Sequence, residues 1–509
     1  SGERRPRSRV SRVRREDAFA IALAAAVVLV ALAAGGAGVA AADPAAASVD
    51  DRAPSTTERA GSPLEGANGT VELVVRFDPV DDPASLGATE GVPATGANAS
   101  ATVADLRAHA DAERGAFESF AAVRPGITVE REFWLANALL VSVDAGNVTA
   151  ADLRAVENVT RIHENVVVEP IEVDRESTTE ADARPQIGAD PSGRAVPGVR
   201  RIGAPAAWER FDTRGGGATV AVVDTGVDPG HRDVDLAGWA SFDENGTLVS
   251  DDLADASDPD GHGTHVAGTV AGGNASGTYI GVAPAATLYG IDAFGEDGTA
   301  TFAGVVASMQ HATVAADADV LQLSLGANGT FRGFVGPVRN ARATGTVVVA
   351  AVGNEGANAS SSPANAYDAV AVGAVDEDRR VPPFSGGGRI DASAAFGEPP
   401  EDWPATYVVP DVTAPGVRVA SAAAGTNGSY VFRQGTSMAA PHASGIAALA
   451  VAATDGRAGP AAIESALVDT AVHPANATAP DPRYGHGVID APAAVGGVVD
   501  AAPPPAEPA

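Results

Sequence analysis

Three separate segments of the chain each carry one residue of a kind that nucleophilic catalysis requires. The segment AVVDTGVD contains Asp224, DGHGTHVAGT contains His262 and GTSMAAPHASG contains Ser437. A serine hydroxyl becomes an effective nucleophile when a histidine accepts its proton and an aspartate orients that histidine. Each residue alone has a plainer explanation, since a serine after Gly-Thr is usually a helix cap and a lone histidine is usually structural. Together they predict a catalytic triad.

A fourth segment, VVVAAVGNEG, is an apolar strand that runs into a turn at Asn354. Asparagine at such a position is ordinarily explained by turn geometry. Opposite a nucleophilic serine, however, its side-chain amide can donate a hydrogen bond to the oxyanion that forms during acyl transfer. We expect Ser437 at the start of an Ala-rich helix, where its own backbone N–H would be the second donor.

Two other chemistries fit these segments less well. Asp-Thr-Gly is also the signature of aspartic proteases, but these need two such carboxylates and the sequence has no second copy. His262 and His265 could share a metal, yet no Glu follows the first His and no third ligand is evident. His442 lies near Ser437 in sequence, but on a different helix face and directly after Pro441. We therefore expect His265 to be structural.

The elements that position these residues lie between about residues 200 and 495. There, short apolar strands alternate with helical stretches rich in Ala and Gly. The predicted strands are Thr219–Val223, Thr287–Ile291, Val320–Ser324, Thr346–Ala351 and Ala369–Val375. Such a pattern indicates an α/β fold with a parallel sheet covered on both faces. Asp224 follows the first strand, at the carboxyl end where open α/β sheets place their ligand-binding groups.

A smaller compact unit is predicted over residues 70–171. Its predicted elements are strand Val71–Phe77, helix Val103–Phe120, strand Phe133–Val143, short helix Thr149–Val156 and a closing strand Val159–Val168. This order suits a small α+β sandwich. Residues 43–69 and 172–199 are polar and rich in Pro, Gly and Ser, and we expect two linkers, the second of them exposed and cleavable. Residues 496–509, with three consecutive prolines, are expected to be a disordered tail.

The first 42 residues have the layout of an export signal. Seven arginines occur among the first fifteen residues, an apolar run covers residues 18–42, and small residues end that run. This pattern predicts a secretory signal peptide, and the run is also long enough to be an uncleaved membrane anchor. Both alternatives place the rest of the chain outside the cell or on its surface.

The composition limits the partners and the chemistry. The formal net charge is −31, and all 34 basic residues are arginine. An acid excess of this size is typical of proteins from extreme halophiles. It also argues against nucleic acid as a partner, because phosphate binding needs clustered cations. The sequence has no cysteine, which excludes disulfides, thiolate metal sites and a cysteine nucleophile.

The order Asp, His, Ser with these flanking residues resembles the subtilisin family over about residues 200–495, whereas other serine hydrolases use other orders. The unit at 70–171 resembles that family's inhibitory propeptide, most clearly in NALLVSVD (137–144) and ENVVVE (164–169). The resemblance, to halolysin-like members in particular, implies a three-layer fold with a mostly parallel sheet, preceded by a ferredoxin-like α+β propeptide domain. It further implies a monomeric serine endopeptidase that acts on polypeptides and is inhibited by its own propeptide.

The resemblance also implies roles for individual residues. Asp224 would orient His262, His262 would take the proton from Ser437, and Asn354 would hold the oxyanion. One substrate-binding edge would be the segment LSLG, with Ser324, Leu325 and Gly326. The facing edge would be the segment 293–298, with Phe294 and Gly298. An extended peptide would add as a β-strand between these two edges.

Calcium is a structural cofactor that this resemblance leaves open, and none is expected for catalysis. Asp233 matches one ligand position of the family, but Ala275 stands where the usual pattern has an asparagine. A second candidate is an acidic segment, which could hold a hard cation through its oxygens or could be a solvated surface. That segment comprises Asp251, Asp252, Asp255, Asp258 and Asp260. No metal site is assigned.

Overall fold

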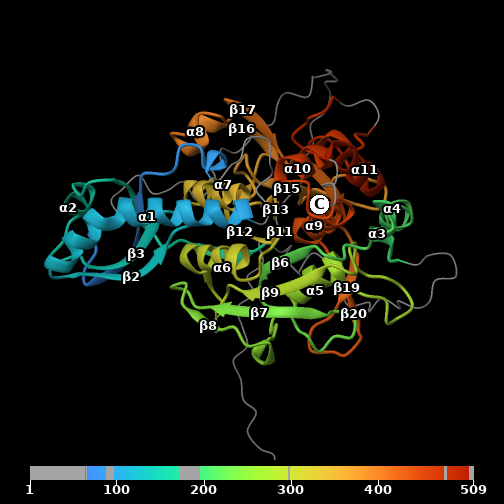
Figure 1. Cartoon of the computed structure of the whole chain (residues 1–509), viewed down its shortest axis with the longest axis horizontal. Coiled ribbons are helices and arrows are strands. Elements are labelled where there is room, and N and C mark those ends of the chain that lie inside the picture. Colours follow the sequence, from blue (N-terminus) through green and yellow to red (C-terminus); the bar gives the residue numbers. More distant parts are fainter. Residues whose placement is uncertain are drawn as a thin grey trace, which may run out of the picture. The chain divides into compact units, whose positions relative to one another are not determined.

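The computed structural model describes residues 64, 66–86, 97–171, 195–295, 298–474 and 478–503 (Figure 1). The predicted signal or anchor at residues 1–42 and most of both predicted linkers lie outside this set. All described residues belong to one compact unit. Among them, no helix combines the length and the apolar character needed to cross a membrane.

The centre of this unit is an eight-stranded sheet with the order β18-β15-β13-β11-β6-β9-β7-β8. Its strands are β6 (Thr219–Asp224), β7 (Leu236–Phe242), β8 (Leu248–Ser250), β9 (Thr287–Asp292), β11 (Val320–Leu323), β13 (Val347–Ala351), β15 (Val370–Val375) and β18 (Val412–Pro415). All neighbours are parallel except β7 and β8, which are antiparallel. The predicted parallel sheet is therefore confirmed.

Helices cover both faces of this sheet (Figure 1). One face carries α3 (Pro197–Arg201), α4 (Ala204–Phe211), α5 (His262–Ala271), α9 (Thr436–Ala453), α10 (Pro460–Asp469) and α11 (Ala491–Ala501), and the other carries α6 (Phe302–Val314) and α7 (Val335–Ala343). The strands are apolar throughout because both of their faces are buried, as strand β6 illustrates. Its Val220 and Val222 are buried in one core cluster, while Ala221 and Val223 are buried in the other.

Short elements complete the described part of this layered structure. They are β10 (Ala300–Thr301), β12 (Leu325–Asn328), β14 (Ser361–Ser362), β16 (Gly388–Asp391), β17 (Thr406–Val409), β19 (Val419–Ala422), β20 (Tyr430–Arg433), α8 (Ala392–Phe396), η3 (Leu253–Asp255) and η4 (Arg332–Phe334). Two predicted boundaries differ from the structure. Helix α3 starts inside the predicted linker 172–199, and α11 continues through Ala501, inside the predicted tail. Val495 and Val498 are buried in the core, which keeps this last helix in place.

The smaller unit has a separate antiparallel sheet with the order β2-β3-β1-β4. Its elements are β1 (Thr70–Phe77), η1 (Pro83–Ser85), α1 (Ala97–Val123), β2 (Ile127–Phe133), β3 (Ala138–Asp144), α2 (Ala150–Arg154) and β4 (Val159–Glu164). The predicted strand Phe133–Val143 is instead the end of β2, a turn, and β3. Asn137 adopts the left-handed conformation with φ 46° and reverses the chain there.

The predicted closing strand Val159–Val168 is also divided. Strand β4 ends at Glu164, and the following residues form β5 (Val167–Pro170), which leaves the small sheet. Strand β5 lies between β10 and β12 of the larger layered structure, in the sheet β10-β5-β12-β14. The separation has a simple cause, because a run such as NVVVE favours a strand but does not specify which partner it pairs with.

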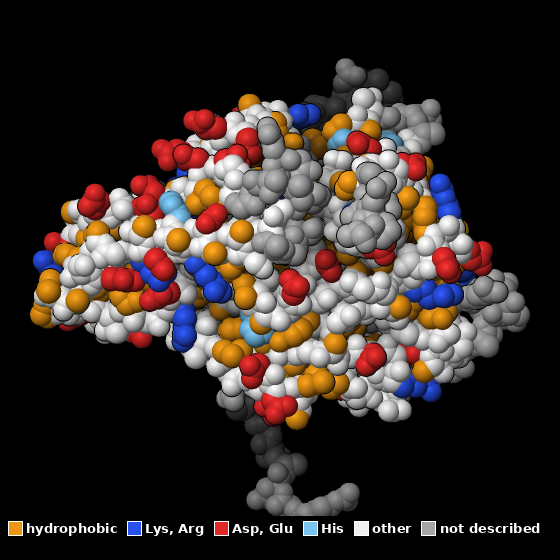
Figure 2. All heavy atoms as spheres, viewed as in Figure 1, with side chains coloured by type: hydrophobic (Ala, Val, Ile, Leu, Met, Phe, Trp, Pro, Cys, Tyr) orange, Lys and Arg blue, Asp and Glu red, His pale blue; other side chains and the backbone are white. Residues whose placement is uncertain are grey.

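The turn between β2 and β3 packs on α6 and α7, beside which the small sheet lies in Figure 1. The Leu135 N–H donates to Gln310 Oε1 (3.0 Å), and the Asn340 side chain donates to the Leu135 carbonyl (2.8 Å). Leu135 is buried in the same core cluster as Phe334 and Val338. The acidic composition is visible in Figure 2, where carboxylates are spread over the face drawn and do not form a single patch.

Candidate active site

The structure brings Asp224 and His262 into direct contact. Asp224 is the last residue of β6 and His262 is the first residue of α5, and both are fully buried. Asp224 Oδ1 lies 2.6 Å from His262 Nδ1 and also accepts the Thr225 N–H at 2.8 Å. The carboxylate places the proton on Nδ1, so Nε2 is the ring nitrogen that can accept a proton from a serine.

The segment around His262 is held by a second buried carboxylate, Asp258. Its Oδ1 accepts from Thr225 Oγ1 (2.9 Å) and from the Gly261 N–H (2.8 Å), and its Oδ2 accepts from the Thr264 N–H (2.7 Å). Burial raises the pKa of Asp258. The position after His262 requires a glycine for steric reasons, because a Cβ on Gly263 would lie 2.0 Å from the Gly226 carbonyl oxygen.

Ser437 lies in the first turn of α9 and is fully buried. Its hydroxyl donates to the carbonyl oxygen of Ile171 at 2.5 Å. Ser324 Oγ donates to the Ser437 carbonyl at 3.0 Å and thereby ties the start of α9 to the central sheet. Ile171 is the residue that directly follows β5. No local pattern in the sequence indicates that a residue 266 positions away contacts the nucleophile.

Asn354 contacts the same carbonyl as Ser437. Its Nδ2 donates to the Ile171 oxygen at 3.0 Å, while its Oδ1 accepts from the Thr436 N–H (2.9 Å) and from Thr436 Oγ1 (3.1 Å). Because Oδ1 is occupied by donors, the amide is oriented with its NH₂ toward Ile171. Asn354 is thus placed as a donor at a carbonyl that the Ser437 hydroxyl also contacts.

Strand β5 leads to this carbonyl and lies between β10 and β12. On one side Glu169 pairs with Gly326 and Pro170 with Leu325, and the Ile171 N–H donates to the Ser324 carbonyl at 3.0 Å. These contacts use the predicted edge LSLG. A peptide segment of this chain therefore occupies the place in which the sequence predicts a substrate strand.

On its other side, β5 pairs with a different segment of the chain from the one expected to face a substrate. Strand β5 pairs with Ala300 and Thr301 of β10, and not with Phe294 or Gly298. The Phe294 side chain is buried in the core, and its N–H donates to Asp292 Oδ1 (2.9 Å). The Gly298 N–H closes a turn on the Gly295 carbonyl.

The two remaining histidines near the triad in sequence are bonded to the backbone. His265 Nε2 contacts the Val419 carbonyl at 3.0 Å, and His442 Nδ1 contacts the Met438 carbonyl at 2.9 Å. Burial lowers the pKa of His265 well below its usual range and lowers the pKa of His442 to about 4. Both rings are therefore neutral and structural near neutral pH.

The residues around Asp233 do not fit a calcium ion. Asp233 Oδ1 accepts the Ala275 N–H and its Oδ2 accepts the Tyr430 hydroxyl, each at 2.5 Å. Both carboxylate oxygens thus already have donors, and Ala275 offers no side-chain oxygen. Burial, and secondly the hydrogen bond to Asp233, raises the pKa of Tyr430, which keeps its hydroxyl a donor. Hydrogen bonds of Asp233 hold this loop.

Three further carboxylates of the acidic segment 251–260 likewise accept hydrogen bonds from nearby residues. Asp252 caps η3, Asp255 accepts from Ser250 (2.6 Å), and Asp260 accepts the His262 N–H (3.1 Å) and contacts Arg433 (3.7 Å). Within the described ranges, no three His, Asp or Glu side chains are grouped so that they could hold a metal.

Replacing Tyr430 with phenylalanine is therefore expected to lower the free energy of unfolding by about 1–3 kcal/mol, because a buried carboxylate loses its donor. Guanidinium denaturation at fixed salt measures this loss. Tyr367→Phe is the matched control, since its ring is 46% exposed and its change should stay below about 0.5 kcal/mol. Added calcium should not raise the melting temperature. A calcium-dependent rise that disappears in Asp233→Asn would contradict this account of the loop.

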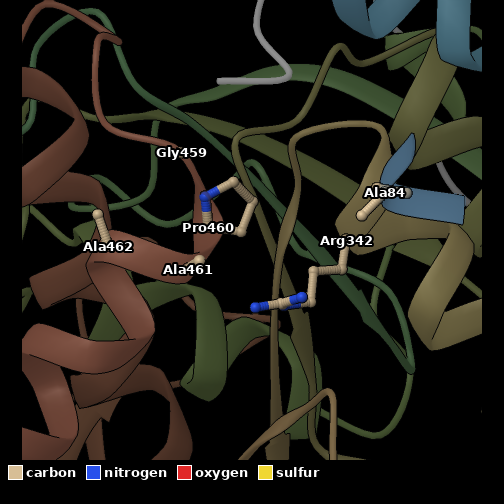
Figure 3. A pocket seen from close by; sticks show the side chains of 7 residues that line it. Ala84, Arg342, Gly459, Pro460, Ala461 and Ala462 are labelled. Carbon is tan, nitrogen blue, oxygen red and sulfur yellow. The ribbon is translucent and has the colours of Figure 1, made fainter. Parts of the chain in front are cut away.

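A pocket of about 300 Å³ lies elsewhere, among Ala84, Arg342, Ala343 and the segment 459–462 (Figure 3). Its only charged lining residue is Arg342, whose guanidinium contacts Glu464 at 2.8 Å. The ion pair neutralises that charge, and the lining contains no nucleophile. The pocket is therefore a poor candidate for a reaction site.

Comparisons with known proteins agree on one family. A profile of the subtilase family matches residues 215–487. Subtilisin BL of Lederbergia lenta is 38% identical over 257 residues, which are 50% of this chain and 84% of that protein. The M-protease of Shouchella clausii (strain KSM-K16) is 36% identical over 293 residues, or 58% of this chain and 66% of that protein. Alkaline elastase YaB of a Bacillus strain is 36% identical over 297 residues, which are 58% of this chain and 69% of that protein.

Proposed function

The chain belongs to the subtilase family of serine endopeptidases, and from this premise we propose that it hydrolyses peptide bonds through Asp224, His262 and Ser437. One observation carries the proposal most directly. The Ile171 carbonyl oxygen receives hydrogen bonds from both Ser437 Oγ (2.5 Å) and Asn354 Nδ2 (3.0 Å). A scissile carbonyl needs a nucleophile and an oxyanion donor, and this carbonyl contacts both.

The geometry supports an acyl-transfer mechanism. His262 Nε2 takes the proton of Ser437 while Oγ bonds to the carbonyl carbon, and Asp224 stabilises the imidazolium. Asn354 donates to the oxyanion, a contribution of about 10²–10³ in turnover when measured in a subtilisin. The tetrahedral intermediate breaks the C–N bond, and His262 returns its proton to the leaving amine. Water, deprotonated by His262, then hydrolyses the acyl-enzyme and regenerates Ser437.

We further propose that residues 70–171 are an inhibitory propeptide. The support is that the unit has the β-α-β-β-α-β order of a ferredoxin-like domain and that its extension, β5, lies between β10 and β12 and leads to the Ile171 carbonyl at Ser437. Leu135 anchors the unit on α6 and α7. While β5 remains there, a substrate strand cannot pair with β10 and β12. The function is therefore that of a precursor that inhibits itself, made for export to the cell exterior or surface.

The residues of β5 also suggest which substrates fit. Val168 and Ile171 are buried, whereas Val167 and Glu169 are exposed. Main-chain hydrogen bonds to β10 and β12 are independent of side-chain identity. We therefore infer an endopeptidase of broad specificity, with apolar preference at the cleaved residue and at the third residue before it.

The bond cleaved in the precursor is expected to be Ile171–Glu172, since this carbonyl contacts Ser437. After expression of the whole chain, the fragment containing residues 70–171 should end at Ile171, and intact mass measurement checks this terminus. Ile171→Asp should slow this cleavage about tenfold or more, because it would bury a charge. Glu169→Gln, at an exposed position of the same strand, should cleave normally.

A fragment that ends elsewhere, with Ser437 intact and casein hydrolysed, would refute the assigned bond but not the peptidase function. A rival proposal is a catalytically inactive binding protein on the same scaffold. It predicts neither a cleaved precursor nor casein hydrolysis in molar salt. The oriented Asn354 amide favours the enzyme, since a binding protein has no need of an oxyanion donor.

A further inference from the structure

A third carboxylate lies at the carboxyl end of the strand next to Asp224. Asp292 is the last residue of β9, and in the parallel pairing of β6 with β9 it is the register partner of Asp224. The two strand ends are also joined by a hydrogen bond from the Ala293 N–H to the Asp224 carbonyl (3.1 Å). Register partners in neighbouring strands project their side chains to the same face of the sheet.

That face is the one on which α5 lies. Val222 and Leu288, two residues before Asp224 and four before Asp292, are buried in the same core cluster as Val266 of α5. Side chains at alternate strand positions share a face, so Asp224 and Asp292 both leave the sheet toward the helix that begins at His262. Asp292 therefore adds a negative charge on the triad's side of the sheet.

The surroundings of Asp292 restrict its carboxylate. Oδ1 accepts the Phe294 N–H at 2.9 Å, and the side chain is only partly exposed. Burial, with added repulsion from Asp258 and Asp224, raises the pKa of Asp292 to about 6. Above this pH the carboxylate is charged, and a charge in such a partly buried place is weakly screened by salt.

The other charged and titratable groups around this corner come from every packed element. The register partner of Asp292 in β7 is Ser241, which is uncharged. The acid that follows β7, Asp243, accepts the Thr247 N–H in its own turn. The remaining groups are Asp258 and Asp260 before α5, His265 within α5, and Arg433 of β20, which contacts Asp260. Acids outnumber cations here, so the local field favours a positive charge on His262.

We propose that Asp292 is a positioning residue of the active site, whose carboxylate acts through space on the Asp224–His262 pair and favours the imidazolium form of His262. The inference rests on the proposed function, in which His262 is the base. A nearby negative charge makes His262 harder to deprotonate, so it raises the pH below which kcat/KM falls. It also stabilises the imidazolium that forms as Ser437 attacks.

Asp292→Asn tests this role in the self-processed protein obtained from the full chain. The acid limb of the pH profile of kcat/KM should move to lower pH by about 0.3–1 unit, a relative gain of about two- to tenfold at a pH on that limb. Asp292→Glu should restore the wild-type limb. Asp292→Ser is the second neutral variant, because its hydroxyl can still accept the Phe294 N–H. Asp251→Asn, which removes an exposed acid, should leave the profile unchanged.

A readout that does not need turnover separates this inference from the proposed function. NMR titration of the His262 ring in a Ser437→Ala background should give a lower pKa when Asp292→Asn is added. If wild type hydrolyses nothing but this pKa falls, the proposed function fails and the inference holds. If wild type is active and the folded neutral variants shift neither the limb nor the His262 titration, the inference is overturned alone.

Discussion

Replacing Ser437 with alanine is expected to leave the chain as one uncleaved precursor and to lower peptide hydrolysis by about 10⁶-fold, the loss measured when a subtilisin nucleophile is removed. The expectation follows from the position of the Ser437 Oγ atom. Ser437 Oγ lies 2.5 Å from the Ile171 oxygen, and the nearby Ser324 hydroxyl is directed to the Ser437 carbonyl. No second hydroxyl among these contacts replaces the nucleophile, so only binding and the oxyanion donor remain.

Intact mass and casein hydrolysis in molar salt measure the two losses together. Ser444→Ala is the matched control in the same helix. Ser444 donates to Gln322 Oε1 (2.5 Å), so its removal costs a buried hydrogen bond but no group that contacts Ile171. The control should be somewhat less stable and fully processed. Equal hydrolysis by wild type and Ser437→Ala would end the triad assignment.

Asp224→Asn is expected to lower kcat by about 10⁴, the loss known for the equivalent change in a serine protease. The carboxylate holds the proton on His262 Nδ1 across 2.6 Å. An amide NH₂ in its place favours the tautomer with the proton on Nε2, which cannot accept a proton from Ser437. Oδ1 also accepts the Thr225 N–H, so an NH₂ group in its place leaves this second donor without an acceptor as well.

Initial rates on a chromogenic peptide, with active enzyme titrated, measure this loss. Precursor cleavage should slow to a comparable degree but remain detectable, unlike in Ser437→Ala. Asp228→Asn is the control, because this acid in the same loop bonds only to backbone N–H groups of Gly230 and Gly425. A kcat for Asp224→Asn within tenfold of wild type would contradict the role given to Asp224.

Much of the fold could be predicted because its signals are local. Strands buried on both faces are continuous apolar runs, and Asp224, at the end of such a run, had only one plausible place in a parallel sheet. The motifs around His262 and Ser437 are set by close packing, as the Gly263 contact with Gly226 demonstrates. Residues fixed by their immediate neighbours are therefore the ones that a sequence can indicate most directly.

What the sequence could not indicate depends on contacts between distant segments. The place of Ile171 is decided by pairing of β5 with β12, more than 150 residues away, although its own sequence is compatible with any sheet edge. The pairing of β5 with Ala300 and Thr301 of β10 likewise joins segments that are far apart in the sequence. No sequence pattern singles out Asp292, because only the register of β6 and β9 sets it beside Asp224.

The two residues between β4 and β5 have a kinetic consequence for the proposed precursor. So short a link delivers the bond after Ile171 to Ser437 of the same molecule, and the first cut is unimolecular, with a half-time independent of concentration. The severed fragment is expected to keep its β-strand pairing and its Leu135 anchor, so we expect activity only when another molecule digests it. That step is bimolecular. Activation of the proposed precursor should therefore accelerate as free enzyme accumulates, and a dilute sample should stay latent far longer than a concentrated one.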